Sequence, residues 1–397
     1  MMTTGSTTPF VPLKYIAEIV SGGTPKSDPN NWDGDIPFIT PPDLNGLDGD
    51  VVSQWERTLT DTGTSGSSIT KDAVLLSCRA PIGHVGVVTS EMAFNQGCKS
   101  IVPQDAEDLA YVAYCLVASR RALQALGRGT TFMEISTTQL SNFSIPWPVC
   151  MDRRAITRYL DRETSEIDAM LAKLASLSES VSERRREIVR SILKSVRQTV
   201  RLGLVVDVAS GSGFPDRFQG IPDGELPFYK VSSLSNVDRQ VLTDSDNTVS
   251  REIADQLGAR VIPSQSVVMA KIGAALLLAR YALTARPSCI DNNMQALVPH
   301  QGVIISRFLA YAMEGVSIPS LVKPGPVPSL DVMGMKMSRI AYNPSLKEQC
   351  RIADHLDEVT GRIDAMLATI DQLRALLVER RAALITDVVT GRKKVPA

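Results

Sequence analysis

The stretch Ile167-Asp168-Ala169-Met170-Leu171-Ala172 occurs a second time, residue for residue, as Ile363-Asp364-Ala365-Met366-Leu367-Ala368. The likeness extends without a gap on both sides, from about 152–197 in the first copy to about 348–392 in the second, at a constant offset of 196 residues. A repeat of this length indicates that the chain is built from two related halves.

Each copy has the pattern of a long helix that pairs with another helix. Apolar residues return at every seventh position: Leu160, Ile167, Leu174, Val181 and Ile188 in the first copy, and Leu356, Ile363, Ile370, Leu377 and Leu384 in the second. Leu171, Leu177 and Ile192 widen the first stripe, and Leu367, Leu373 and Val388 widen the second. A seven-residue period is typical of supercoiled helices. We expect two rods of roughly 65–70 Å that pair with each other, although a helical hairpin that is only a scaffold has the same pattern.

Composition limits the class of protein. A chain of 397 residues allows two or three domains, and 44% hydrophobic with 21% charged residues suits a globular protein. The net charge of −1 gives no indication of a nucleic-acid partner. The six cysteines form no C-x-x-C pair, the N-terminus lacks the pattern of a signal peptide, and the most apolar run, 272–279, is too short to cross a bilayer. We therefore expect a reducing, cytoplasmic compartment.

The segments before the two long helices also resemble each other. Gly224–Phe228 matches Gly34–Phe38, Ser266–Met269 matches Ala73–Leu76, and Asn292-Asn293 matches Asn95-Gln96. The pattern of Asp108–Gly127 predicts one helix in the first of these segments. The expected fold is therefore α+β, with two similar mixed α/β globules at 1–150 and 200–346 and long helices at 151–199 and 347–397.

The sequence contains no constellation typical of catalysis or metal binding. The phosphate-binding pattern G-x-x-x-x-G-K-[ST] is absent, and Thr40-Pro41-Pro42-Asp43 lacks the acceptor and the aromatic ring that amino-methyltransferases use. The three histidines His84, His300 and His355 lie in different segments. We expect no catalytic residue, no metal and no cofactor bound by this chain.

The globule loops combine basic and polar side chains with glycine, as nucleic-acid-binding loops do. Arg and Lys bind guanine edges or phosphates, Asn and Gln bind adenine, and glycine lets a backbone approach phosphate. The candidates in the first globule are Lys26, Arg79, His84, Asn95, Gln96, Lys99, Arg128, Thr130 and Thr131. Those in the second are Arg217, Lys230, Lys271, Arg286, Asn292, Asn293, Gln295 and Lys323. Any one of them could instead be an ordinary solvated side chain, and the Asn95 and Asn292 pairs could be turn residues.

The first long helix also carries the run Arg184-Arg185-Arg186. Charge runs of this kind usually mark a solvated face or pairs between helices. Contact with a phosphate backbone or a partner protein is the other interpretation.

This arrangement resembles the DNA-specificity subunit of type I restriction–modification systems. The resemblance covers nearly the whole chain and rests on the duplicated layout and on the segments Pro148–Leu171 and Pro344–Leu367. Pro344–Asp357 is close to the family pattern of Pro, Glu-Gln, Ile-Ala and Leu-Asp. The first copy departs from that pattern, because Asp152-Arg153-Arg154 stands where Glu-Gln is usual.

The resemblance implies that each globule is a target-recognition domain that reads one half of a bipartite DNA site. The long helices would pair as an antiparallel coiled coil, relate the halves by a pseudo-twofold axis and set the unread spacer. Two readers on one side of B-DNA lie roughly 34–36 Å apart, or one helical turn.

The family also implies partners that carry the chemistry, and no membrane. Two methyltransferase subunits would dock on the chain, flip out an adenine in each half-site and methylate it with S-adenosylmethionine. A motor–nuclease subunit that uses ATP and Mg would add translocation and cleavage in complexes that contain one. Two alternatives stay open at this point: a non-catalytic protein-interaction scaffold, and an enzyme with a site around Arg79 and Asn95.

Overall fold

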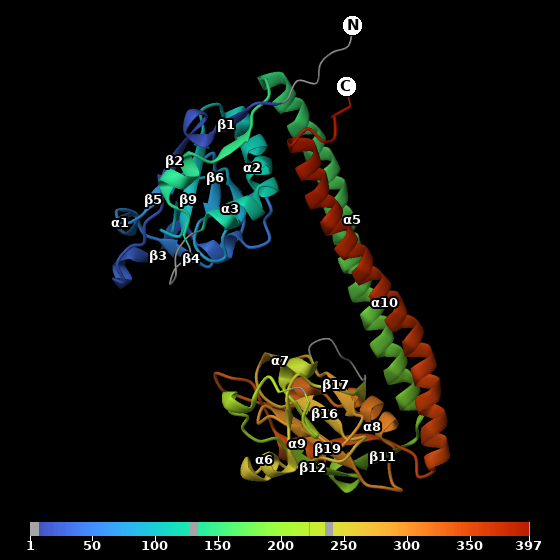
Figure 1. Cartoon of the computed structure of the whole chain (residues 1–397). Helices are drawn as coiled ribbons and strands as arrows, with labels where there is room; N and C mark the ends of the chain where they lie inside the picture. The colour runs from blue at the N-terminus through green and yellow to red at the C-terminus, as the bar shows by residue number, and fades with distance from the viewer. Residues whose placement is uncertain (1–7, 128–133, 222, 235–240, 397) are drawn as a thin grey trace. The chain divides into compact units, whose positions relative to one another are not determined.

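The computed structural model describes residues 8–127, 134–221, 223–234 and 241–396. Two long helices, α5 (Cys150–Ser195) and α10 (Leu346–Val389), follow the two globules along the chain (Figure 1). The first helix is shorter than predicted because Gln198–Arg201 forms strand β11. The second ends before Gly391, which adopts a φ of +73° that favours glycine.

The chain forms two compact units, each containing one globule and a part of both long helices. One unit comprises the chain up to Ala175 together with residues from Asp371 onward, and the other comprises Ser176–Ile370. In the first unit Asp168 of α5 pairs with Arg381 of α10, and the Lys393 ammonium after α10 lies 5.4 Å from the Tyr159 ring. The helix segments of this unit are therefore antiparallel.

The predicted heptad positions lie on the less exposed side of the helices. Leu160, Ile167, Leu356, Ile370, Leu377 and Leu384 are buried, and Leu174, Val181, Ile188 and Ile363 are half-buried. The core of the first globule continues into Leu160, Ile167, Leu377 and Leu384, and the core of the second continues into Val189, Leu193 and Leu356. Each globule thus shares its hydrophobic core with the helices of its own unit.

The prediction that Leu177 and Leu373 belong to the buried stripes was wrong, since they are 47% and 45% exposed. They lie three positions after the heptad residues Leu174 and Ile370. The second buried line instead falls four positions after a heptad residue, where Thr164, Arg185, Thr360 and Arg381 are at most 8% exposed. The apolar members of the same line, such as Val388, were part of the predicted stripes, but an apolar pattern could not reveal these four, because two carry a guanidinium and two a hydroxyl.

The first globule contains two four-stranded sheets. The first has the order β2-β9-β6-β7 and the second the order β4-β3-β8-β5, in which only β3 and β8 are parallel. The strands are β2 (Ala17–Ser21), β9 (Cys98–Pro103), β6 (Ala73–Ser77), β7 (Val85–Val88), β4 (Arg57–Leu59), β3 (Trp32–Ile39), β8 (Met92–Phe94) and β5 (Ser68–Thr70), while β1 (Phe10–Pro12) pairs with β10 (Ser144–Pro146). The helices are α1 (Asp61–Thr64), α2 (Leu109–Ala118), α3 (Arg120–Leu126) and α4 (Thr137–Ser141).

The second globule repeats the central strand order. Its larger sheet runs β12-β19-β16-β17-β14, and a smaller one runs β15-β13-β18. The strands are β12 (Val206–Ser210), β19 (Met294–Pro299), β16 (Val267–Ala270), β17 (Tyr281–Thr284), β14 (Val241–Leu242), β15 (Thr248–Val249), β13 (Leu226–Tyr229) and β18 (Cys289–Ile290), while β11 pairs with β22 (Arg339–Tyr342) and β20 (Val322–Lys323) with β21 (Ser329–Leu330). The helices are α6 (Arg251–Gln256), α7 (Ala274–Leu277), α8 (Ser306–Ala312) and α9 (Val332–Met337).

The predicted fold class, two mixed globules alternating with two long helices, is confirmed. One prediction within it needs correction, because the single helix expected over 108–127 is two helices separated at Ser119. Just after that break, Arg120 donates a hydrogen bond to the Gly83 carbonyl (2.9 Å) and pairs with Asp48. In the part of the chain that the structure describes, no helix is long and apolar enough to span a bilayer.

Candidate nucleic-acid interface

In the first globule four strands, β2, β3, β6 and β8, end at one edge, where their outgoing loops are joined by backbone hydrogen bonds. We call the loops 21–25, 40–45, 78–84 and 95–98 the first loop edge. The bonds run from Gly22 N to Cys98 O (3.2 Å), Gly23 N to Phe94 O (3.1 Å), Asn95 N to Ile39 O (2.8 Å) and Cys78 N to Gly97 O (2.7 Å). This hydrogen-bonded backbone frame presents the loop side chains on a common edge.

The second globule has the same frame. The second loop edge comprises the loops 210–213, 230–234, 271–273 and 291–293. Its bonds run from Gly211 N to Met294 O (3.3 Å), Ser212 N to Ile290 O (3.0 Å), Asp291 N to Tyr229 O (2.9 Å) and Lys271 N to Asn293 O (2.8 Å). The duplication therefore extends from the helices to the hydrogen bonds of the loops.

A glycine is required at the same point of both edges. A Cβ at Gly22 would lie 2.1 Å from the Asn95 carbonyl oxygen, and one at Gly211 would lie 1.9 Å from the Asp291 carbonyl oxygen. The side chain of Asn95 accepts from Gly97 N (2.7 Å), as that of Asp291 accepts from Asn293 N (2.9 Å). Asn95 therefore corresponds to Asp291, and the sequence match of Asn95 with Asn292 was wrong by one residue.

These contacts give Asn95 and Asp291 a turn-forming role, which the sequence had left as an alternative for Asn95 and had not suggested for Asp291. Asn95 also donates from its amide to Thr24 Oγ1 (3.0 Å). Burial raises the pKa of Asp291, and the nearby Lys230 and Lys271 lower it in part. The second edge thus holds a carboxyl group that feels the charges of two lysines, whereas the first has a neutral amide.

The structure distributes the other first-globule candidates unevenly. Lys26 and Gln96 are exposed, and Arg79 pairs with Glu134 (2.9 Å) while its side chain stays 40% exposed. The pKa of His84 is lowered by burial and by Arg120, so its ring is neutral at pH 7. The candidates Arg128, Thr130 and Thr131 lie outside the described residues.

In the second globule most candidates gather at the loop edge. Lys230, Lys271, Asn292 and Asn293 belong to this edge, and Lys230 donates a hydrogen bond to Gln219. The exposed Lys323 lies on β20, which pairs with β21, and Ser329 of β21 forms a bridge with Ile272 of the edge. Arg217 is exposed in the segment before Gln219. Arg286 follows β17, whose antiparallel pairing with β16 places its end at the opposite side of the sheet. The structure therefore does not bring Arg286 together with the others.

Lys99 and Gln295 are a correction to the predicted interface. They occupy the same register, since Lys99 pairs with Ser21 across β2 and β9 and Gln295 pairs with Ser210 across β12 and β19. Lys99 is 4% exposed and donates to Ser21 Oγ (3.1 Å), and Gln295 is fully buried and accepts from Ser210 Oγ (3.2 Å). A side chain buried in the sheet cannot contact DNA in this conformation.

Two polar contacts per globule, which the sequence analysis missed, join the globule to its helices. Tyr114 of α2 donates to Asp161 of α5 (2.8 Å) and lies 3.3 Å from Thr164 Oγ1. Tyr311 of α8 donates to Asp357 of α10 (2.6 Å) and lies 3.0 Å from Thr360 Oγ1. We call these contacts the tyrosine anchors. The available signal was the recurrence of Asp and Thr at the same repeat positions.

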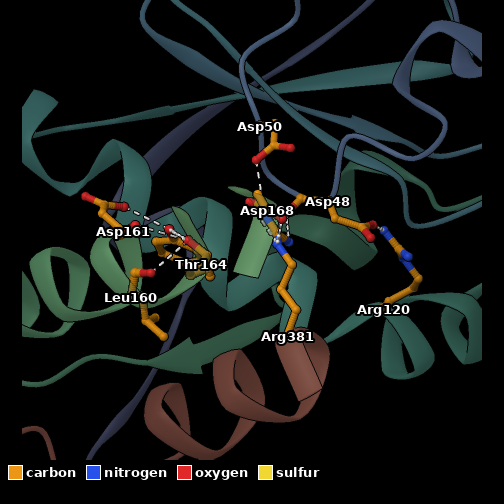
Figure 2. A network of polar contacts seen from close by, with 9 residues as sticks. Asp48, Asp50, Arg120, Leu160, Asp161, Thr164, Asp168 and Arg381 are labelled. Atoms are coloured by element: carbon orange, nitrogen blue, oxygen red, sulfur yellow. Dashed lines mark hydrogen bonds and ion pairs between the residues drawn. The ribbon is translucent and has the colours of Figure 1, made fainter. Parts of the chain in front are cut away.

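The second contact is made by an arginine of the other helix. Arg381 of α10 lies between Asp168 of α5 and Asp50 of the globule, with 3.1 Å to each carboxylate (Figure 2). In the second unit Arg185 of α5 pairs with Asp364 of α10 (2.6 Å) and approaches Glu314 of the globule (3.9 Å). We call these contacts the arginine anchors. Among the described residues no group of three His, Cys, Asp or Glu side chains could hold a metal ion.

Comparison with known proteins gives consistent results. A family model described as the type I restriction modification DNA specificity domain matches residues 6–178. The type I restriction enzyme MjaIX specificity subunit of Methanocaldococcus jannaschii is 25% identical over 343 residues, which cover 78% of this chain and 79% of that protein. The putative MjaX specificity subunit of the same organism is 24% identical over 178 residues, or 44% and 39% of the two chains.

One solved structure shares the fold. It belongs to a study of complex assembly and conformational transition of the type I restriction–modification system, and it has a TM-score of 0.60 at 14% identity. The match covers 97% of this chain and 98% of that chain. The similarity therefore includes both globules and both long helices.

Proposed function

This chain belongs to the DNA specificity subunits of type I restriction–modification systems, and from that membership we propose that its two loop edges read the two halves of a bipartite DNA site. The chain is the non-catalytic recognition subunit of a larger enzyme complex. The helices α5 and α10 set the length of the unread spacer between the half-sites.

The observation that carries this proposal is the duplicated loop edge. Each edge is a frame of four backbone hydrogen bonds with exposed polar side chains. Gln96 belongs to the first edge and Lys26 follows it, while Asn292 belongs to the second and Lys323 lies on the strand pair that bridges to it. Phosphates bind lysine and arginine, and base edges bind amides and guanidinium groups. Two equivalent frames with different side chains suit a site whose halves differ in sequence.

The partners in this proposal are two methyltransferase subunits, which use S-adenosylmethionine to methylate one adenine in each half-site. Motor–nuclease subunits with ATP and Mg join in complexes that cleave unmodified DNA. The chain itself is proposed to bind no cofactor. We place the complex in the cytoplasm, where DNA is accessible and where the six cysteines, all unpaired in the structure, would remain reduced.

The test is to map adenine methylation in host DNA by long-read sequencing, with the gene present and deleted. A two-part methylation motif that disappears on deletion supports the proposal and reads out both half-sites. An unchanged set of motifs in a host that expresses the complete complex contradicts it.

The spacer function has its own test. Deleting one heptad from α5 and the matching heptad from α10 should change the preferred spacer and leave both half-sites as they were. An unchanged spacer in a folded, active variant contradicts the role of the helices.

A further inference from the structure

The two arginine anchors form a reciprocal pair across the repeat. Arg381 occupies the position of Arg185 in the other copy, and Asp168 occupies that of Asp364. Each arginine binds the aspartate of the opposite copy: Arg185 donates from Nε (2.6 Å) and Nη2 (3.1 Å) to Asp364, and Arg381 Nε lies 3.1 Å from Asp168. The same two repeat positions therefore join α5 to α10 in both units.

The arginines differ from their neighbours in burial. Arg185 and Arg381 are 7% and 8% exposed, whereas the Arg184 side chain is 71% exposed and Arg380 is also exposed. A guanidinium is rarely buried unless its charge is paired. Its planar fork can serve two acceptors in different directions, which a lysine ammonium does less well.

Each anchor extends to a third element, the globule. Arg381 reaches Asp50 through Nη2 (3.1 Å) and the Asp48 carbonyl through Nη1 (3.4 Å), both in the loop before β4. Arg185 approaches Glu314 in the short 3-10 helix that follows α8. The arginine–aspartate pair between the two helices is the same in both units, but the acidic residue of the globule comes from unrelated elements. The contact between arginine and globule is thus present twice, built by different means.

The tyrosine anchors explain what the arginine adds. Tyr114 donates a hydrogen bond to Asp161 of α5, and Tyr311 donates one to Asp357 of α10. The hydrophobic cores already join each globule to both helices, but apolar contacts are not directional, and a polar contact fixes the orientation more narrowly. Arg381 gives the first globule a polar contact with α10, and Arg185 gives the second globule one with α5, so each globule has directional contacts with both helices.

We propose that Arg381 and Arg185 are positioning residues that fix the orientation of each recognition globule on the helix pair and thereby the spacer length that the complex accepts. This inference rests on the proposed reading of a bipartite site. Neither arginine contacts a base in this scheme, so the sequence of each half-site does not depend on them.

The experiment uses the complex assembled from this chain and its methyltransferase subunits. Its affinity is measured for duplexes that carry both mapped half-sites, with the native spacer or a spacer one base pair longer or shorter. The variants are Arg381→Gln, Asp50→Asn and the exposed control Arg380→Gln. Asp50→Asn removes the charge on the globule side of the anchor and leaves the pair with Asp168 and the contact with the Asp48 carbonyl in place. The 60% exposure of the Asp50 carboxylate makes the substitution tolerable for folding.

Arg381→Gln and Asp50→Asn should each reduce the preference for the native spacer by about tenfold, within the range of couplings between linked sites. The half-site sequences should stay unchanged, and Arg380→Gln should behave as wild type. A uniform loss of affinity at every spacer length in both variants, or an equal effect of Arg380→Gln, overturns the inference. Failure of the proposed function is separate, because the wild-type complex would then show no preference for the two-part site.

Discussion

The joint between globule and long helix is built from a charge pair in the first half and from a neutral amide in the second. Arg153 at the start of α5 donates from Nε and Nη2 to Asp108 (2.7 Å each) and from Nη1 to the Pro148 carbonyl (2.7 Å). Its repeat counterpart, Gln349, accepts from Ile305 N (2.9 Å) and donates to the carbonyls of Val303 (2.9 Å) and Asn343 (2.7 Å).

The difference explains why the first copy lacks the Glu-Gln of the family pattern. Arg153 replaces the glutamine, and Asp108 stands where the second globule has Ile305, just before the helix that carries the tyrosine anchor. Both solutions satisfy buried polar groups, since Asp108 and Arg153 are 3% and 8% exposed and Gln349 is fully buried. Both halves therefore have a polar joint at the same place, and the two halves differ there at two positions, Arg153 against Gln349 and Asp108 against Ile305.

The largest effect is expected from breaking the charged joint. Arg153→Ala leaves the Asp108 carboxylate buried without its partner, so we expect a loss of about 3–5 kcal/mol in the free energy of unfolding. Gln349→Ala leaves neutral groups unpaired and should cost about 1–3 kcal/mol. Denaturant unfolding of the two variants measures both values, and equal losses would contradict the comparison.

A double substitution sharpens the same test. Asp108→Ile together with Arg153→Gln imitates the second half, and it should recover most of the stability lost in Arg153→Ala. A double variant no more stable than Arg153→Ala would show that the two joints are not interchangeable.

The second largest loss in the free energy of unfolding is expected at the tyrosine anchors. Tyr114→Phe and Tyr311→Phe each remove one hydrogen bond to a carboxylate that water can still reach, and we expect losses of about 1 kcal/mol. Asp357 keeps its pair with Arg307 (2.5 Å), so the loss at Tyr311 should be the smaller one. The control is Tyr15→Phe, because Tyr15 is 62% exposed, and it should change the free energy of unfolding little. The reverse order for Tyr114 and Tyr311 would argue against this reason.

A smaller effect distinguishes the exposed from the buried lysine of the first globule. Lys26→Ala should lower the slope of log affinity against log salt by about 0.9 if Lys26 contacts one phosphate. Lys99→Gln, which copies the residue of the second half, should leave that slope unchanged because Lys99 lies inside the sheet. DNA binding of the assembled complex at several salt concentrations gives both slopes, and a change for Lys99 alone would reverse the assignment.

The smallest effect is expected at Asp50 and depends on pH. Burial raises the pKa of this carboxyl, Arg381 lowers it in part, and Asp168 and Asp48 raise it. A carboxyl with a higher pKa in the folded chain than in the unfolded chain reduces stability where it is ionised. Because the Asp50 side chain is 60% exposed, solvent screens this effect, and Asp50→Asn should stabilise the chain by at most about 0.5 kcal/mol at pH 7. This gain should disappear as the pH falls through the raised pKa toward 3.8. A gain that grows on acidification, measured against the exposed Glu91→Gln, would contradict the sign.

The sequence alone determined the two long helices, their pairing and the alternation with two related globules. These features follow from local periodicity: Leu160 and Ile167, or Leu377 and Leu384, share a helix face through their spacing, whatever the rest of the chain does. The heptad line could therefore be predicted. The polar members of the second line, Thr164, Arg185, Thr360 and Arg381, could not, because polar side chains are buried only when distant partners satisfy them.

Only the tertiary structure decided which polar residues hold the molecule together and which remain available to a ligand. Arg185 belonged to a run with the pattern of a solvated face, yet it is buried, and Lys99 was a candidate for DNA contact but lies within the sheet. The partner of Arg381 on the globule, Asp50, is more than three hundred residues away in the chain. Such contacts depend on long-range packing and on strand register, and neither leaves a period in the sequence.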